Sequence, residues 1–179
     1  MTTQKKPSDA ALRRGAARLA AVQATYQLSL TGGRIDDVLS DLISGAIGGE
    51  VIAEDPDLET EEVVPLIEMH AELFSVLVRG VDAMKTRLDE VIDASLGTNW
   101  DSTRLEPLTR SILRCGLYEL LERPTMPARG CISEYVDITR SFFEGAEPGM
   151  VNAVLDKLAR QIRPEEMEAA RRPRPADGA

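Results

Sequence analysis

Histidine and cysteine are almost missing from this chain, and their scarcity argues against zinc and disulfide chemistry. His70 is the single histidine among 179 residues, and Cys115 and Cys131 form neither a CxxC pair nor a disulfide framework. A zinc site built on Cys and His is therefore not expected. No run of about 18 apolar residues occurs, which excludes a conventional membrane-spanning helix. The basic N-terminus lacks a continuous apolar segment, so we expect no secretory signal and predict a cytoplasmic location.

Motifs of catalytic sites are also missing. The sequence contains no GxSxG elbow, no P-loop ending in GK[ST] and no HExxH. His70 lies beside Glu68 and Glu72, and we interpret it as structural or solvent-exposed. The glycines of residues 45–49 follow no predicted strand, so they do not indicate a phosphate loop. The acidic segment 50–62 does not match a calcium loop, which favours a solvated loop over a divalent-cation site. We therefore expect no enzyme activity, no metal and no cofactor.

Aromatic residues make up only 4% of the chain, and no segment alternates convincingly between apolar and polar residues. Apolar residues recur at helical spacing instead, which predicts an all-α fold without a sheet. Cys115 and Cys131 fall on predicted helices and are expected in the core. Residues 50–60 are predicted as a loop, and a capping box at Thr103–Glu106 is predicted to start one of the helices. The expected helices are about seven: residues 9–30, 35–47, 60–78, 80–96, 107–122, 128–143 and 148–162.

The first predicted helix has clear ends. Ser8 is a candidate N-cap, and Gly32 tolerates the left-handed backbone that ends a helix. Residues 1–8 are predicted to be a flexible basic leader, 9–163 a single helical domain, and 164–179 a disordered tail. The apolar stripe of the first predicted helix is expected to consist of Leu12, Ala16, Leu19, Gln23, Tyr26 and Leu30.

Charge is unevenly distributed along the chain. The formal net charge is −9, and residues 35–78 contain acidic residues but neither Lys nor Arg. Arg14 and Arg18 are four residues apart and therefore share a helix face, which could hold the phosphates of a single-stranded nucleic acid. The alternative is a solvated face that pairs with the acidic remainder. The basic residues at the N-terminal end are Lys5, Lys6, Arg13, Arg14 and Arg18.

Five motifs then follow one another along residues 12–163. They are Arg14 with Ala17-Arg18 and Ala21-Val22-Gln23-Ala24 before Tyr26; Leu77-Val78-Arg79-Gly80-Val81; Arg110 and Leu113-Arg114 before Tyr118-Glu119-Leu120; Ile132-Ser133-Glu134-Tyr135-Val136; and Phe142 followed by Val151-Asn152-Ala153-Val154-Leu155-Asp156-Lys157. Together, and in this order, they resemble the NusB family of bacterial transcription antitermination factors.

The resemblance implies an all-helical fold of two small bundles that share the long first helix. The corresponding subdomains are about residues 9–96 and 102–163. It also implies a non-catalytic protein that binds the boxA element of ribosomal RNA leader transcripts together with NusE, a ribosomal small-subunit protein. Such a complex joins RNA polymerase and other Nus factors in antitermination, and some members form homodimers.

Several residues acquire expected roles from this resemblance. Arg14 and Arg18 match basic positions of the RNA-facing first helix, and Arg13 joins them by proximity. Arg110 and Arg114 match basic positions of a later helix and are expected as secondary RNA contacts, although they could equally pair with Glu106. The residues expected in partner binding or packing are Tyr26, Glu119 and Asn152.

Some positions depart from the family pattern, which leaves an alternative open. Gly15 and Ala16 interrupt what is often a longer arginine run, and Ser133 replaces an asparagine. An RNA contact near Ala146, Gly149 and Met150 is in doubt, because these residues replace others that are common there. The alternative function is a helical protein-interaction adaptor without specific RNA recognition. A third hypothesis, a module serving an RNA methyltransferase, would need a separate catalytic subunit.

Overall fold

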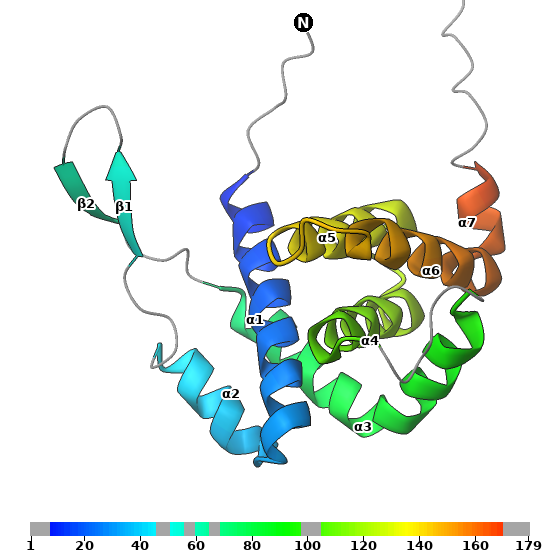
Figure 1. Ribbon diagram of the computed structural model, residues 1–179, viewed down its shortest axis with the longest axis horizontal. Helices are drawn as coiled ribbons and strands as arrows, with labels where there is room; N and C mark the ends of the chain where they lie inside the picture. The colour runs from blue at the N-terminus through cyan, green and yellow to red at the C-terminus, as the bar shows by residue number, and fades with distance from the viewer. Residues whose placement is uncertain (1–7, 46–50, 56–59, 65–68, 98–104, 170–179) are drawn as a thin grey trace, which may run out of the picture. The chain divides into compact units, whose positions relative to one another are not determined.

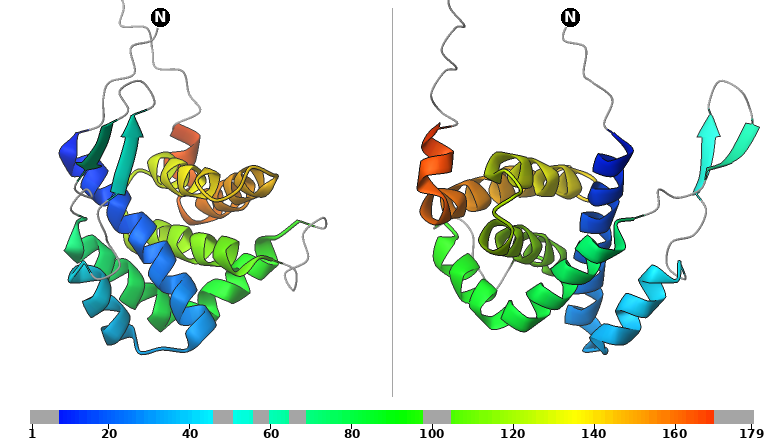
Figure 2. Two further views of the ribbon diagram at one scale, coloured as in Figure 1. Left: turned by 60° about the vertical axis from the view of Figure 1, so that its left-hand side comes forward. Right: turned by 180° about the vertical axis from the view of Figure 1, so that it is seen from behind.

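The computed structural model describes residues 8–45, 51–55, 60–64, 69–97 and 105–169. Within them the chain is predominantly helical, as predicted, but it also contains a two-stranded sheet (Figures 1 and 2). The elements are α1 (Asp9–Thr31), α2 (Ile35–Ile43), β1 (Val51–Asp55), β2 (Thr60–Val64), α3 (Ala71–Ser95), α4 (Pro107–Glu122), α5 (Ala128–Arg140), α6 (Glu147–Ile162) and α7 (Pro164–Ala169). No described helix is long and apolar enough to cross a membrane.

The chain divides into two compact units, residues 1–79 and 80–179. The boundary between these units falls inside α3. Helix α3 is one continuous helix, whereas the sequence predicted two helices, 60–78 and 80–96. Gly80 in α3 serves a close approach, because a Cβ there would collide with the ring of Tyr118 on α4.

Helix α1 begins and ends as predicted. The Ser8 hydroxyl accepts a hydrogen bond from the Ala11 amide at 3.3 Å, and Gly32 ends the helix with φ 62°. The predicted apolar stripe is wrong, because Gln23 is exposed and Leu30 is 59% exposed. Small residues form the buried face instead, since alanine lets neighbouring backbone come close. The fully buried members are Ala17, Ala21, Val22 and Ala24.

The hairpin of β1 and β2 corrects the prediction of a loop at 50–60 and of a helix starting at 60. The strands are antiparallel, with Val51 opposite Val64 and Asp55 opposite Thr60. β-Branched residues at both ends of the register favour extended backbone. Pro65 directly after β2 cannot donate a ladder hydrogen bond, which suits the end of a strand. The sequence analysis missed the hairpin because its acidic residues obscured these short apolar pairs.

The remaining predicted helices are found with shifted ends. Helix α2 stops at Ile43 rather than residue 47, and α5 stops at Arg140 rather than residue 143. Thr103 of the predicted capping box lies outside the described residues. The cap of α4 is Glu106 itself, whose carboxylate accepts hydrogen bonds from the amides of Leu108 and Thr109 at 2.8 and 3.0 Å. Cys115 and Cys131 are buried, as expected.

Helix α7 occupies the start of the segment that was predicted to be a disordered tail. Arg163, between α6 and α7, donates hydrogen bonds to the carbonyl oxygens of Leu120 at 2.6 Å and Met126 at 2.7 Å. Glu166 accepts a hydrogen bond from the Ala128 amide at 2.6 Å. A cation therefore meets the carboxyl end of α4 and a carboxylate meets the amino end of α5, which is the favourable sign at each helix end. Arg163 and Glu166 thus form a clamp on α4 and α5. The sequence did not predict it, because the clustered Pro and charged residues there indicated disorder.

Candidate nucleic-acid interface

The N-terminal turns of α1 present two arginines on the surface of the first unit. Arg13 and Arg14 are both exposed, in the second turn of the helix. Adjacent positions on a helix point about 100° apart, so the two guanidinium groups cover a broad angle rather than one narrow stripe. Each guanidinium can donate a fork of hydrogen bonds to phosphate.

Arg18 does not share this exposure, although it lies one turn further along α1. It is 3% exposed and has an interaction partner within the protein. Arg14 and Arg18 therefore do not form the common exposed face that their spacing predicts. Arg14 is exposed, whereas Arg18 is buried. A buried guanidinium in this place supports the helix rather than meeting a ligand from solvent.

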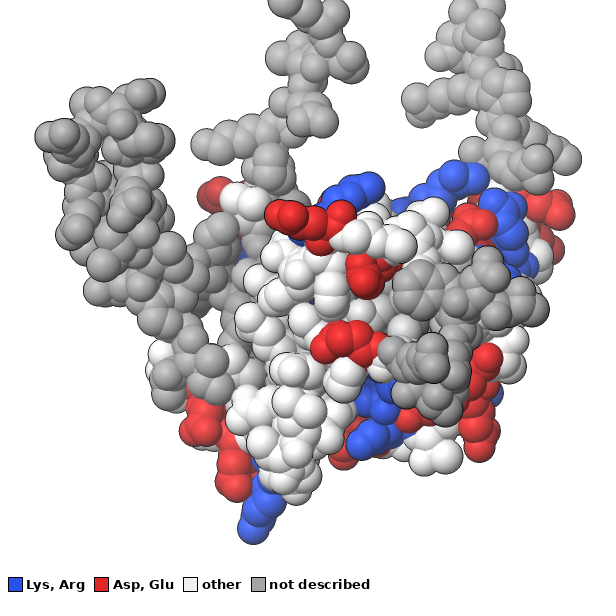
Figure 3. Space-filling view, in the orientation of Figure 1, with Lys and Arg blue, Asp and Glu red and all other residues white. Residues whose placement is uncertain are grey.

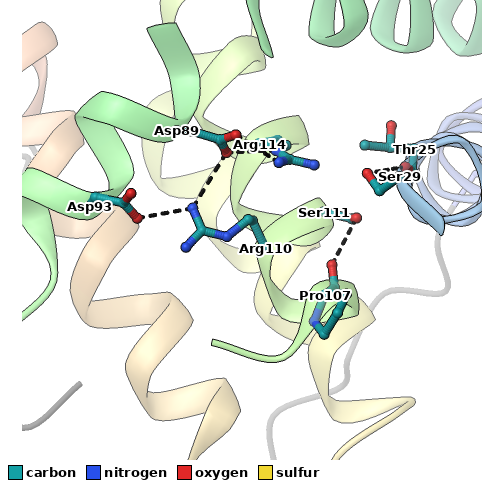
Figure 4. Close-up of polar contacts among 8 residues, drawn as sticks. All are labelled: Thr25, Ser29, Asp89, Asp93, Pro107, Arg110, Ser111 and Arg114. Carbon is teal, nitrogen blue, oxygen red and sulfur yellow. Dashed lines mark hydrogen bonds and ion pairs between the residues drawn. The ribbon is translucent and has the colours of Figure 1, made fainter. Parts of the chain in front are cut away.

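Arg110 and Arg114 on α4 lie side by side, as their spacing predicts, but acidic residues of α3 accompany them (Figure 4). The Arg114 guanidinium is bidentate on Asp89, with both nitrogen–oxygen distances 2.7 Å. Arg110 pairs with Asp93 at 2.9 Å and with Asp89 at 3.4 Å. Asp89 thus bridges both arginines, and the pairing with Glu106 considered from the sequence is replaced by pairing with α3.

The electrostatics of this cluster favour the ion pairs. Burial alone would raise the pKa of the Asp89 carboxyl, but hydrogen bonds and charge from Arg114 and Arg110 outweigh it and hold this pKa below its usual value. The Arg114 side chain is only 7% exposed, whereas the Asp93 side chain is 41% exposed. Arg114 is therefore nearly buried, and Arg110, whose side chain is 17% exposed, is the more accessible of the two.

The three residues expected in partner binding or packing, Glu119, Tyr26 and Asn152, differ in how deeply they are buried. Glu119 is fully buried, and its carboxylate accepts a hydrogen bond from the Tyr135 hydroxyl at 3.0 Å. This contact favours packing for Glu119. Tyr26 is half-buried, which is compatible with both of its expected roles, and Asn152 is exposed on α6.

Three departures from the family pattern lie at the start of α6, where Ala146 directly precedes the helix and Gly149 and Met150 fall in its first turn. Ala146 and Gly149 are exposed, and the space around a Cβ at Gly149 is open. Met150 is buried, so its side chain belongs to the core of the second unit. Phe142, just after α5, is 41% exposed.

Charged side chains of both signs are interspersed on the face drawn in Figure 3. No group of His, Cys, Asp and Glu suited to a metal ion occurs among the described residues. His70 is exposed and caps the first turn of α3, in agreement with the structural interpretation.

Sequence reasoning missed the counter-ions of the α4 arginines and the role of Arg163. One signal was present: Asp89 and Asp93 are four residues apart, so they share a helix face just as Arg110 and Arg114 do. Two such faces of opposite charge predict a mutual pairing between helices. The spacing of Arg163 carries no comparable signal, because its partners are backbone carbonyls.

Comparison with known sequences gives a consistent result. The sequence matches the NusB family over residues 15–160. A Rhodospirillum rubrum protein named transcription antitermination protein NusB is 53% identical over 167 residues, which cover 90% of this chain and 90% of that protein. A Bradyrhizobium protein of the same name (strain BTAi1) is 46% identical over 155 residues, covering 87% of this chain and 86% of the relative.

Solved structures show the same fold. T. maritima NusB superposes with a TM-score of 0.67 at 22% identity, covering 92% of this chain and 99% of that one. A crystal structure of the antitermination factors NusB and NusE in complex with double-stranded RNA superposes with a TM-score of 0.62 at 20% identity, covering 84% and 97%.

Proposed function

Because this chain belongs to the NusB family, we propose that it acts as an RNA-binding transcription antitermination factor. The observation that carries the proposal is the exposed pair Arg13 and Arg14 at the start of α1. The family is one of transcription antitermination proteins, and the chain is not an enzyme.

The proposed RNA contacts fall into two groups. Arg13 and Arg14 are the primary contacts, because both side chains are exposed near the start of α1. Arg110 is a secondary contact, since a phosphate there must compete with Asp93 for the guanidinium. Arg18 and Arg114 act through the fold: both are nearly buried, and they support the helices that carry the other arginines.

The proposed ligand is the boxA element of ribosomal RNA leader transcripts, bound together with NusE. A similar protein has been crystallised with NusE and RNA, which supports both partners. We further propose that this complex joins RNA polymerase and other Nus factors in the cytoplasm. Without NusE two states are open to the chain, a monomer and a homodimer. Tyr26 and the exposed Asn152 are the proposed positions for contacts with protein partners.

The test is a titration of fluorescent boxA RNA with and without NusE, beside a scrambled RNA at the same salt concentration. The variant Arg13→Glu/Arg14→Glu is compared with Arg129→Glu/Arg140→Glu. Both variants reverse two exposed arginines and change the net charge equally, but the second pair lies on α5. We expect the α1 variant to lose about tenfold or more in boxA affinity, with a shallower salt dependence, and the α5 variant to lose much less.

Equal losses in the two variants would show that general charge, and not the α1 surface, controls binding. Equal affinity of the wild-type protein for boxA and scrambled RNA, with NusE still bound, would instead support the adaptor function. The homodimer is tested separately by sedimentation with and without NusE, where NusE should convert a dimer into a heterodimer.

A further inference from the structure

His70, the single histidine of the sequence, stands immediately before α3 and caps its first turn. Its imidazole Nδ1 accepts a hydrogen bond from the Leu73 amide at 3.2 Å, and its carbonyl accepts one from the Phe74 amide at 3.1 Å. The first amides of a helix have no partner within it, so this contact satisfies one of them. Only an unprotonated Nδ1 can accept, which defines the neutral imidazole as the capping form.

The backbone of the same residue makes a second contact, this time with α1. The His70 amide donates a hydrogen bond to the carbonyl oxygen of Arg13 at 3.0 Å. Two segments far apart in the sequence are thereby joined in the first unit, at the turn of α1 that carries Arg13 and Arg14. Helix ends fray more readily than helix centres, so a bond from outside the helix at this turn has a larger effect than one at its middle.

We propose that His70 is a positioning residue for RNA binding: it caps α3 and so holds the α3 start against the Arg13 turn of α1. This inference rests on the proposed function. The imidazole fixes the backbone of its own residue, and this backbone bonds the Arg13 carbonyl. The two exposed arginines are then pre-ordered before RNA arrives, and less ordering entropy is lost on binding.

The experiment compares two substitutions of His70 with a matched control. His70→Ala removes the capping acceptor, whereas His70→Asn keeps one, because asparagine is among the best N-caps. Glu166→Ala is the control, since it removes the cap at the start of α5 in the second unit. Affinity for boxA RNA is measured at a temperature where every variant is folded, and amide hydrogen exchange is measured at His70 and Leu73.

We expect His70→Ala to bind boxA about fivefold more weakly, the equivalent of one lost helix cap, and to exchange the His70 amide faster. His70→Asn should restore both affinity and protection to within about twofold of the wild type. Glu166→Ala should leave both unchanged. If His70 only stabilised the fold, His70→Ala and Glu166→Ala would affect RNA binding alike.

The proposal is overturned if His70→Ala binds boxA as the wild type does, or if Glu166→Ala weakens binding equally. It is also overturned if His70→Asn fails to restore affinity while it restores the protection of Leu73. Failure of the proposed function has a different signature: the wild type itself would not prefer boxA over scrambled RNA. In that event amide exchange alone decides whether the imidazole holds the Arg13 turn.

Discussion

Two arginines of α1, Arg13 and Arg14, differ from Arg114 and Arg163 of the second unit in the surroundings of their guanidinium groups. Arg13 and Arg14 project from the surface, whereas Arg114 is held by Asp89 and Arg163 by the carbonyl oxygens at the end of α4. The difference comes from what each neighbourhood supplies. A guanidinium beside a fixed carboxylate or a helix carboxyl end is satisfied by that partner, whereas Arg13 and Arg14 are exposed to solvent.

A basic residue therefore indicates nucleic-acid binding only after its partners within the protein are known. Arg110 lies between the two cases, because Asp93 is exposed and can be displaced. The arginines should therefore separate by phenotype. Substitutions in the second unit should lower stability, substitutions in the α1 pair should lower RNA affinity, and exposed arginines paired locally should do little of either.

The largest effect is expected at Arg163. Replacement by methionine keeps much of the side-chain volume but leaves the carbonyl oxygens of Leu120 and Met126 without their donor. We expect the free energy of unfolding to fall by about 2–3 kcal/mol, because several partly buried acceptors lose a charged partner together. Chemical denaturation followed by circular dichroism measures this loss.

Arg160→Met is the matched control for that experiment. Arg160 lies one turn away on α6 and forms an exposed pair with Asp156. Its loss should change the free energy of unfolding by no more than about 0.5 kcal/mol. Similar losses in both variants would contradict the assignment of Arg163 as the clamp of α4.

The next effect is expected at Asp89. Its folded pKa is lowered, so its stabilising contribution is complete above the unfolded pKa of about 4 and is lost as the pH falls through the lower folded pKa. Asp89→Asn should cost about 1–2 kcal/mol at neutral pH, since Arg114 loses its bidentate partner. Below pH 4 the variant and the wild type should converge in stability.

Denaturant titrations at pH 7, 5 and 3 provide this measurement. Asp93→Asn serves as the control, because its more exposed carboxylate contacts Arg110 alone. A constant difference between Asp89→Asn and the wild type across this pH range would show that the loss is not caused by the charge of Asp89.

A smaller free-energy change is expected from Arg14→Ala, and it should appear in RNA binding alone. Removing one phosphate contact should weaken boxA binding by about threefold to tenfold and lower the slope of log affinity against log salt by about 0.7. The free energy of unfolding should stay within about 0.5 kcal/mol, as for other surface substitutions. A salt series of fluorescence titrations distinguishes this result from misfolding.

The smallest effect is expected from Arg140→Ala. Arg140 pairs with Asp137 one turn earlier on α5, and both side chains are more than half exposed. We expect less than about 0.5 kcal/mol in stability and no measurable change in boxA affinity. A clear loss of RNA binding in this variant would place α5 in the RNA interface. It would contradict the distinction between the exposed arginines of α1 and the locally paired arginines of the second unit.

Much of the helical fold could be predicted from the sequence because its signals are local. The cap at Ser8, the left-handed Gly32 and the spacing of apolar residues on α5 and α6 all act within a few residues. The hairpin and the unbroken α3 could not be predicted in this way. Facing strands stabilise one another, and Gly80 is explained only by Tyr118 on another helix.

The candidate site was predictable in composition but not in arrangement. Helical spacing placed Arg14 and Arg18 on one face and so missed that only the first is exposed. Whether an arginine is buried depends on which residues surround it in the folded unit, and a single sequence does not encode that by spacing alone. The same reason explains why Asp89 was not recognised as the partner of Arg114.

The clamp made by Arg163 and Glu166 also has a consequence for the order of events during synthesis. Helices α4 and α5 are translated before either clamp residue. The carbonyl oxygens at the end of α4 and the Ala128 amide therefore depend on water until Arg163 and Glu166 emerge after α6. The first unit, complete by residue 79, has no such delay. Vectorial folding should thus finish the arginine-bearing helix early and lock the second unit only at the end.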